Sequence, residues 1–149
     1  MRIRIYLDTS VIGGCADDEF QEHSVSLLNM AGRGEATLLV SSHLADEIAQ
    51  APPQVKEVFS ALPSEHVERV AVTEEAILLQ NAYLDAGVLG AGHAADALHV
   101  AIATVARADL IVSWNFRHIV HLDKIRGFNA VNMLHGYPAI EIRSPVEVA

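Results

Sequence analysis

The chain has 149 residues, of which 51% are hydrophobic and 19% are charged. This balance is typical of a compact globular protein and excludes a disordered chain, and the length predicts one domain spanning residues 1–149. The formal net charge of −9 disfavours a protein that holds nucleic acid by broad neutralisation of phosphates. Cys15 is the only cysteine, which excludes an intrachain disulfide and a zinc ribbon and is typical of a protein in a reducing cytoplasm.

No targeting or membrane-spanning segment is expected. A charged residue, Asp8, interrupts the apolar start of the chain and leaves no room for a signal peptide. The most apolar later segment, residues 94–106, contains Asp96 and His99 and is shorter than the roughly 20 apolar residues that a spanning helix needs. We therefore expect a cytoplasmic protein without a membrane partner.

The first half of the chain alternates buried-strand patterns with helix patterns. Residues 2–7 carry Ile or Leu at alternate positions and then run into polar residues, which predicts a strand that enters a loop at Asp8. Ser41 and Ser42 are suited to cap a helix that carries Glu47. Glycines and prolines mark where the neighbouring helices end. The other elements expected here are a helix over residues 22–31, a strand over residues 36–40 and a helix over residues 55–62.

The second half repeats this alternation. Thr73 is suited to cap a helix that continues to Ala86, and apolar residues at spacings of three and four predict a long helix over residues 93–107. The expected strands cover residues 67–72, 110–113 and 140–142. Alternating strands and helices predict right-handed crossovers, so the expected fold is a three-layer α/β/α one with a central, mainly parallel sheet of four to five strands.

Three acidic side chains are expected at one edge of this sheet. Asp8 ends the first strand, Glu47 lies in the first turns after the second strand, and Asp96 lies in the first turn of the long helix. The carboxyl ends of parallel strands share one edge, where ligands bind. Two carboxylates about 5 Å apart repel by about 3 kcal/mol at an effective dielectric of 20, and a cation removes that cost. Oxygen ligands without cysteine favour Mg²⁺ or Mn²⁺, whose bound water can attack a phosphodiester.

Each acid also has a simpler explanation. Acids in first helical turns are favoured by the helix dipole, so Glu47 or Asp96 alone is well explained as solvated surface. Asp8 differs, because an acid that directly ends a buried strand is hard to explain as surface. The three acids together therefore favour a metal site more than any one of them does.

The motifs that contain these acids resemble those of the PIN-domain nucleases, and within them the VapC-like toxins of bacterial toxin–antitoxin pairs. Each motif alone is weak, but their order and spacing are fairly specific. The resemblance spans nearly the whole chain and rests on residues 6–10, 41–48, 95–99 and 111–116, with residues 129–132 and 137–138 similar to the closing segment of one subgroup.

The resemblance implies that Asp8, Glu47 and Asp96 bind metal and that the chain is an Mg²⁺- or Mn²⁺-dependent endonuclease that cuts RNA. It also implies a homodimer that is silenced by a cognate antitoxin. The family often has Asp at its fourth catalytic position, where this chain has Asn115. An amide can bind a metal through its carbonyl oxygen but brings no negative charge, so we expect one well-occupied ion.

Weaker candidates surround these acids. Thr9 and Ser113 are expected to hydrogen-bond the acids or the attacking water. Trp114 either stacks on a base or seals the sheet edge, and the sequence does not separate these roles. Arginines suited to contact phosphate oxygens are Arg33, Arg117 and Arg126. The eight histidines include the spaced pairs His43–Glu47, Asp96–His99 and His118–His121, which we expect to be surface or supporting groups more than a zinc site, although His99 and His118 are also candidates to touch substrate.

Two other classes of function are left open. A protein-binding module that keeps a nuclease-like fold without catalysis is favoured by the negative charge and by Asn115. A receiver-type phosphoacceptor domain also binds Mg²⁺ at strand ends, but Thr73 follows the third strand where that domain needs Asp, and no Lys lies near Ser113. A dinucleotide-binding domain is weaker still, because residues 8–11 lack its glycine-rich turn.

Overall fold

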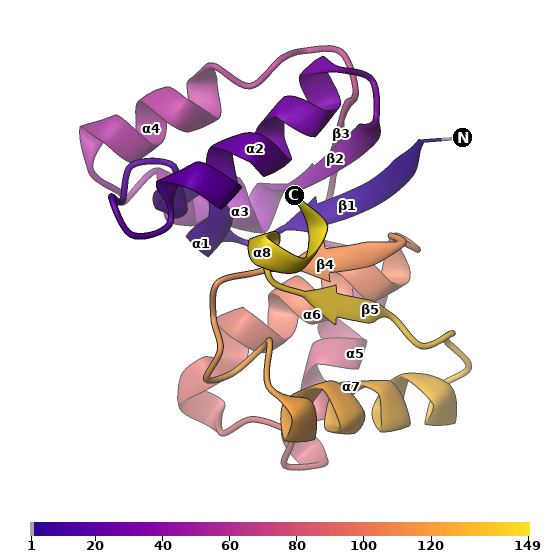
Figure 1. The fold of residues 1–149 in the computed structure, drawn as a ribbon. Helices are drawn as coiled ribbons and strands as arrows, with labels where there is room; N and C mark the ends of the chain where they lie inside the picture. Colours follow the sequence, from indigo (N-terminus) through magenta and orange to yellow (C-terminus); the bar gives the residue numbers. More distant parts are fainter. Residues whose placement is uncertain (1) are drawn as a thin grey trace.

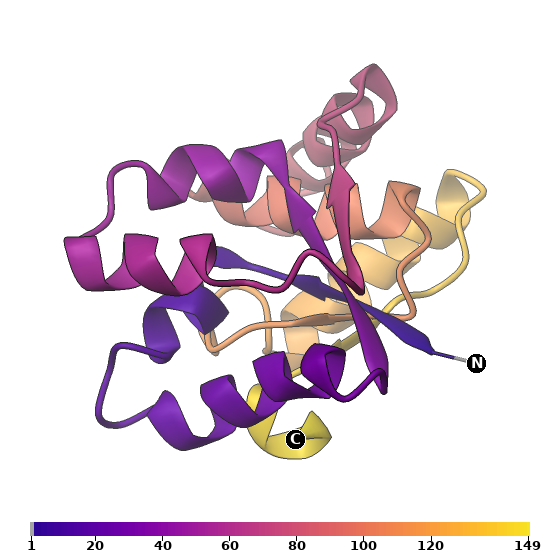
Figure 2. The same cartoon turned by 90° about the horizontal axis from the view of Figure 1, so that it is seen from above.

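The computed structural model describes residues 2–149, and within them five parallel strands form one sheet (Figures 1 and 2). The spatial order of the strands is β3-β2-β1-β4-β5, and every neighbouring pair is parallel. The strands are β1 (Ile3–Leu7), β2 (Ala36–Ser41), β3 (Val67–Val70), β4 (Leu110–Val112) and β5 (Glu141–Arg143). The expected parallel sheet is therefore confirmed, and all its pairs are parallel rather than most of them.

Helices cover both faces of this sheet. In Figure 1, α1 to α4 lie above the sheet, and α5 to α7 lie below it. The helices are α1 (Thr9–Gly14), α2 (Gln21–Gly32), α3 (Ser42–Ile48), α4 (Pro53–Ser60), α5 (Glu74–Asp85), α6 (Ala94–Val105), α7 (Leu122–Leu134) and α8 (Pro145–Val148), with the short 3₁₀ helix η1 (Ala91–His93) before α6. The expected three-layer α/β/α fold is confirmed. None of the helices within residues 2–149 has both the length and the apolar character that crossing a bilayer requires.

Alternate residues of the central strand β1 belong to two separate cores. Tyr6 packs into the core that contains α5, α6 and α7, whereas Ile5 and Leu7 pack into the core that contains α1, α2 and α3. All three side chains are fully buried. The second half of β1, residues 5–7, is apolar and buried on both faces, as in a central parallel strand, and this apolar run ends at Asp8. Packing on both faces also fixes where the strand ends, and hence where Asp8 lies.

Three helices were not expected from the sequence. The prediction of a loop at Asp8 is wrong, because α1 begins at the next residue; it is short, contains two glycines and is held by the fully buried Val11 and Ile12. α7 was missed because its apolar residues are interspersed with asparagines and lysine, and the exposed Leu134 blurs the pattern. α8 was also missed; it has only four residues and starts with a capping box at Ser144.

Gly14 allows α1 to approach Trp114 closely. A Cβ at this position would lie 2.4 Å from Ser24 Oγ and 2.8 Å from Trp114 Nε1, two atoms that are hydrogen-bonded to each other at 2.7 Å. We expect Gly14→Ala to lower the free energy of unfolding by about 1–3 kcal/mol because it overpacks this contact. Urea unfolding measures the effect. Gly13→Ala is the matched control, since its Cβ would meet nothing within 4 Å; an equal loss in both variants would contradict the expectation.

Candidate metal centre

Asp8 lies at the point where the order of the strands reverses along the sheet. β1 is flanked by β2 on one side and by β4 on the other, and Leu7 pairs with Val112. The residues that follow this pair, Asp8 and Ser113, therefore leave the sheet side by side. In open parallel sheets, ligands bind beyond the carboxyl ends of the strands at such a switch point. The topology thus puts Asp8 where α/β proteins place their ligands.

The carboxylate of Asp8 is buried, with 4% of the residue exposed. Ser10 Oγ donates to Oδ1 and Ser113 Oγ donates to Oδ2, each at 2.6 Å. Asp8 is the N-cap residue of α1, but its side chain caps no backbone N–H. Burial raises the pKa of Asp8 and the charge of Asp96 raises it further, while His99 and the two hydroxyls oppose this only in part. A divalent cation would stabilise the ionised form of this carboxylate.

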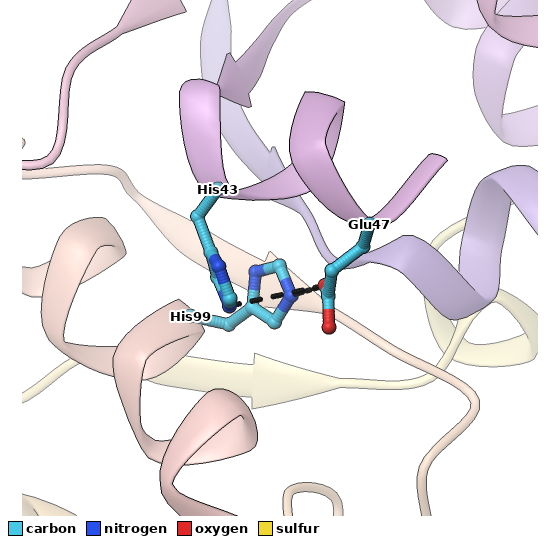
Figure 3. A group of neighbouring side chains, drawn as sticks. All are labelled: His43, Glu47 and His99. Carbon is cyan, nitrogen blue, oxygen red and sulfur yellow. Dashed lines mark hydrogen bonds and ion pairs between the residues drawn. The ribbon is translucent and has the colours of Figure 1, made fainter. Parts of the chain in front are cut away.

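Glu47 lies on α3, and its Oε1 atom is held by residues from other elements. His99 Nε2 donates to it at 2.6 Å, and His43 Nε2 lies 3.8 Å away (Figure 3). Thr9 Oγ1 donates to the same oxygen. Burial alone would raise the pKa of Glu47, but the hydrogen bonds from His99 and Thr9 and the charges of both imidazoles lower it to about 2. Glu47 is therefore ionised at neutral pH. Within residues 2–149 no side chain hydrogen-bonds its other oxygen, Oε2.

A buried chain of hydrogen bonds holds His99 beneath Glu47. The Tyr6 hydroxyl lies 2.7 Å from His99 Nδ1 and 2.8 Å from Ser41 Oγ, which also accepts the N–H of Leu44 and so caps α3. One assignment satisfies every atom: Ser41 donates to Tyr6, Tyr6 donates to His99 Nδ1, and His99 Nε2 donates to Glu47. This chain links β1, β2, α3 and α6, and it fixes the direction of the Glu47 side chain.

Asp96 belongs to a second group of possible metal ligands. One ligand atom from each of His93, Asp96 and His118 lies within 4.8 Å of the others, and the same is true of His43, Glu47 and His99. The rings of His93 and His118 are stacked, with centroids 3.7 Å apart and planes inclined by 28°. Burial lowers the pKa of His118, and the charge of His93 lowers it further.

The three predicted acids lie at one edge of the sheet but do not form a closed triad. Asp96 is near enough to raise the pKa of Asp8, and Asp8 and Glu47 both add to the effect of burial in raising the pKa of Tyr6. Among the residues described, however, their oxygens do not all lie within 4.8 Å of one another. Like charges repel without a cation between them, and Glu47 is drawn toward His99. Hard divalent ions such as Mg²⁺ prefer oxygen ligands, so these carboxylates are suitable ligands for one.

The weaker candidates occupy defined places around these acids. Thr9 and Ser113 each hydrogen-bond one of the predicted acids. Trp114 donates from Nε1 to Ser24, and its ring centroid lies 4.4 Å from that of Phe20, so it packs against α2 and the segment before it. Arg117 is exposed. Their catalytic or substrate-binding roles stay predictions.

The sequence reasoning missed Tyr6, Ser10 and the position of His99 beneath Glu47. The sequence spacing of each of these residues from a predicted acid could have indicated it. Tyr6 precedes Asp8 by two residues and so faces the same side of the strand, Ser10 follows Asp8 by two, and His99 follows Asp96 by one helical turn.

Asn115 uses its side-chain oxygen to hold a turn. Oδ1 accepts the backbone N–H groups of Arg117 at 3.2 Å and His118 at 2.9 Å. A direct metal-binding role for this oxygen stays a prediction. We expect Asn115→Ala to lower the free energy of unfolding by about 1 kcal/mol, because both N–H groups lose their acceptor. Asn115→Asp keeps the acceptor and is expected to unfold at nearly the wild-type urea concentration; equal losses in the two variants would contradict this explanation.

The sequence matches no family model and no curated protein. The structure, in contrast, is similar in fold to several solved structures. One is VapBC2 from Rickettsia felis bound to a DNA fragment from their promoter, with a TM-score of 0.62 and 13% identity over 95% of this chain and 98% of that chain. Another is FitAcB from Neisseria gonorrhoeae, with a TM-score of 0.59 and 16% identity over 97% of this chain and 99% of that chain.

A third similar structure is FitAB bound to an IR36 DNA fragment, with a TM-score of 0.58 and 15% identity over 95% of this chain and 94% of that chain. At such identities the similarity is one of fold. It extends over nearly the full length of each matched chain. The resemblance to VapC-like PIN proteins that the motifs indicate is therefore confirmed at the level of the fold.

Proposed function

We propose that this chain is a single-domain, Mg²⁺- or Mn²⁺-dependent endoribonuclease and that it acts in the cytoplasm as the toxin of a toxin–antitoxin pair. The observation that supports this most is the carboxylate of Asp8, which is buried at the switch point of the sheet beside the charge of Asp96. Among the residues described, no Lys or Arg forms an ion pair with Asp8. A divalent cation would offset the negative charge that this arrangement of acids concentrates.

The side chains around the acids have separate tasks in this proposal. Asp8, Asp96 and Glu47 would hold the ion, which when bound supplies an activated water and neutralises charge on the phosphate oxygens. Ser10 and Ser113 orient the two oxygens of Asp8. A pKa of about 2 makes Glu47 a poor proton acceptor at neutral pH, which favours a ligand role over that of general base.

The partners of this chain are part of the same proposal. The similar structures are VapBC2 and FitAB complexes, two of them bound to DNA fragments. By analogy of fold, we propose a cognate antitoxin as the protein partner, RNA as the substrate and a homodimer as the assembly. Because the net charge is −9, RNA contacts must come from local positive groups, and the exposed Arg117 beside Asn115 is the first to test.

Incubation of the pure protein with a panel of structured RNAs, with and without Mn²⁺, tests the proposal. We expect cleavage that requires Mn²⁺, is lost in Asp8→Asn and persists in Asp109→Asn. Asp109 is a matched control, since it is an exposed acid that precedes β4 and accepts the backbone N–H of Arg4 at 2.7 Å. If the folded wild type leaves the whole panel uncut, the enzyme proposal is overturned in favour of the protein-binding module, which the engaged side-chain oxygen of Asn115 also favours.

A further inference from the structure

His93, Asp96 and His118 converge from three pieces of chain. His93 ends η1 and is the N-cap residue of α6, yet its side chain caps no backbone N–H. Asp96 lies three residues later, on the same side of the helix. His118 comes from the connection between β4 and α7, where Asn115 Oδ1 holds its backbone N–H at 2.9 Å. The helix start and the capped turn thus bring the three side chains together.

The ring nitrogens of this group are free, in contrast to those of the group around Glu47. Both nitrogens of His99 are used in hydrogen bonds, to Tyr6 and to Glu47, and His43 Nε2 is 3.1 Å from the carbonyl of Ala95. Among the residues described, no hydrogen bond engages the side chains of His93 or His118. The stacked rings can therefore rotate toward a shared ion without breaking a hydrogen bond.

We propose that His93, Asp96 and His118 form a binding site for Zn²⁺, Co²⁺ or Ni²⁺ beside the oxygen-ligand site at Asp8. Imidazole nitrogens suit these ions, whereas Mg²⁺ prefers oxygen ligands. Two imidazoles and one carboxylate supply three ligands, which leaves at least one position of the ion open to water or to another molecule. The site shares Asp96 with the nuclease centre proposed above, but it does not depend on RNA cleavage.

Titration of metal-free, tag-free full-length protein by calorimetry tests this site. We expect the tightest Zn²⁺ site to be weakened at least about tenfold by His93→Ala and by His118→Ala, because each removes a direct ligand. His121→Ala is the matched control, since His121 is an exposed histidine three residues from His118 whose side chain caps nothing. It is expected to bind Zn²⁺ like the wild type. Visible absorption of bound Co²⁺ should change in the same two variants.

The outcomes separate this site from its alternatives. Unchanged Zn²⁺ affinity in His93→Ala and His118→Ala, with thermal unfolding like that of the wild type, overturns the proposal. It is also overturned if His43→Ala removes the tightest Zn²⁺ binding, because the ion would then lie beside Glu47. Mg²⁺ affinity is expected to stay unchanged in both histidine variants. Zn²⁺ binding that depends on His93 and His118 supports the site even if no RNA is cut, in which case the nuclease proposal alone fails.

Discussion

Asn in place of Asp8 is expected to abolish RNA cleavage while stabilising the metal-free protein. The amide keeps the size of the carboxylate, its oxygen can still accept from one of Ser10 and Ser113, and its NH2 group can donate to the hydroxyl of the other, so the fold should persist. It removes the negative charge that the proposed ion needs. Loss of one electrostatic contact in an active site typically costs about 10²–10³ in kcat, and we expect at least that reduction. Single-turnover cleavage in Mn²⁺ measures it.

The gain in stability follows from the raised pKa of Asp8. Burial makes the ionised form less favourable in the folded protein than in the unfolded chain, so above the folded pKa the charge costs stability. As the pH falls through that pKa, Asp8 takes up a proton and the cost disappears. Without metal, Asp8→Asn should therefore unfold at a higher denaturant concentration than the wild type at neutral pH, and the difference should shrink in acid.

Added Mn²⁺ should make the wild type more stable than Asp8→Asn, because ligand binding stabilises only the protein that binds the ligand. We expect Mn²⁺ to raise the melting temperature of the wild type and to leave that of Asp8→Asn unchanged. Asp109→Asn should respond to Mn²⁺ as the wild type does. If Asp8→Asn is less stable than the wild type in chelator, Asp8 is a structural residue. If Mn²⁺ raises the melting temperature of Asp8→Asn as much as that of the wild type, Asp8 does not hold the ion.

The sequence was informative where one side-chain property recurs at a regular interval. β1 carries Ile or Leu at alternate positions, β2 is an almost wholly buried apolar run, and α6 repeats apolar residues every three or four positions, so these elements could be predicted. Asp8 was chosen as a candidate site residue for a related reason. A charge that directly ends a buried strand breaks the pattern at the one edge of a parallel sheet where ligands bind.

The parts that were missed depend on packing between distant segments. α1 has two glycines and is stabilised by burial of Val11 and Ile12 rather than by helix propensity, so its local sequence did not identify it. The contact of Glu47 with His99 joins residues 52 positions apart. Such a contact is set by rotamers at an interface between helices. Their positions in the sequence predicted that these residues lie at one edge of the sheet, but not which side chains hydrogen-bond to one another.

Truncation of His99 to Ala is expected to have the largest effect on stability. His99 is 2% exposed, and both of its ring nitrogens are hydrogen-bonded. The substitution creates a cavity and removes a partner from Tyr6 and Glu47, which should cost about 2–4 kcal/mol. For a chain of this size the melting temperature should fall by roughly 5–15 °C. His43→Ala is the control, because the His43 side chain is mostly buried but lies 3.8 Å from Glu47 and, within residues 2–149, only one of its ring nitrogens has a hydrogen-bond partner. This substitution is expected to cost less than half as much stability as His99→Ala.

The same substitution should change the titration of Glu47. Its pKa is lowered to about 2 mainly by the hydrogen bond from His99, so without that bond the pKa should move back toward 4.5. A lowered carboxylate pKa stabilises the fold above pH 4.5, and this stabilisation is lost as the pH falls toward 2. The stability gap between the wild type and His99→Ala should therefore be widest at neutral pH and narrow in acid. Carboxyl-carbon NMR measures the pKa directly.

His99→Gln separates the positioning role of His99 from its contribution to packing. The side-chain amide can still donate to Glu47 and accept from Tyr6, although it fills less space than the imidazole. We expect it to recover part of the lost stability and to keep the pKa of Glu47 below its ordinary value. If Gln and Ala raise the pKa of Glu47 equally, or if neither changes it, the buried chain from Ser41 through Tyr6 and His99 does not hold Glu47 in place.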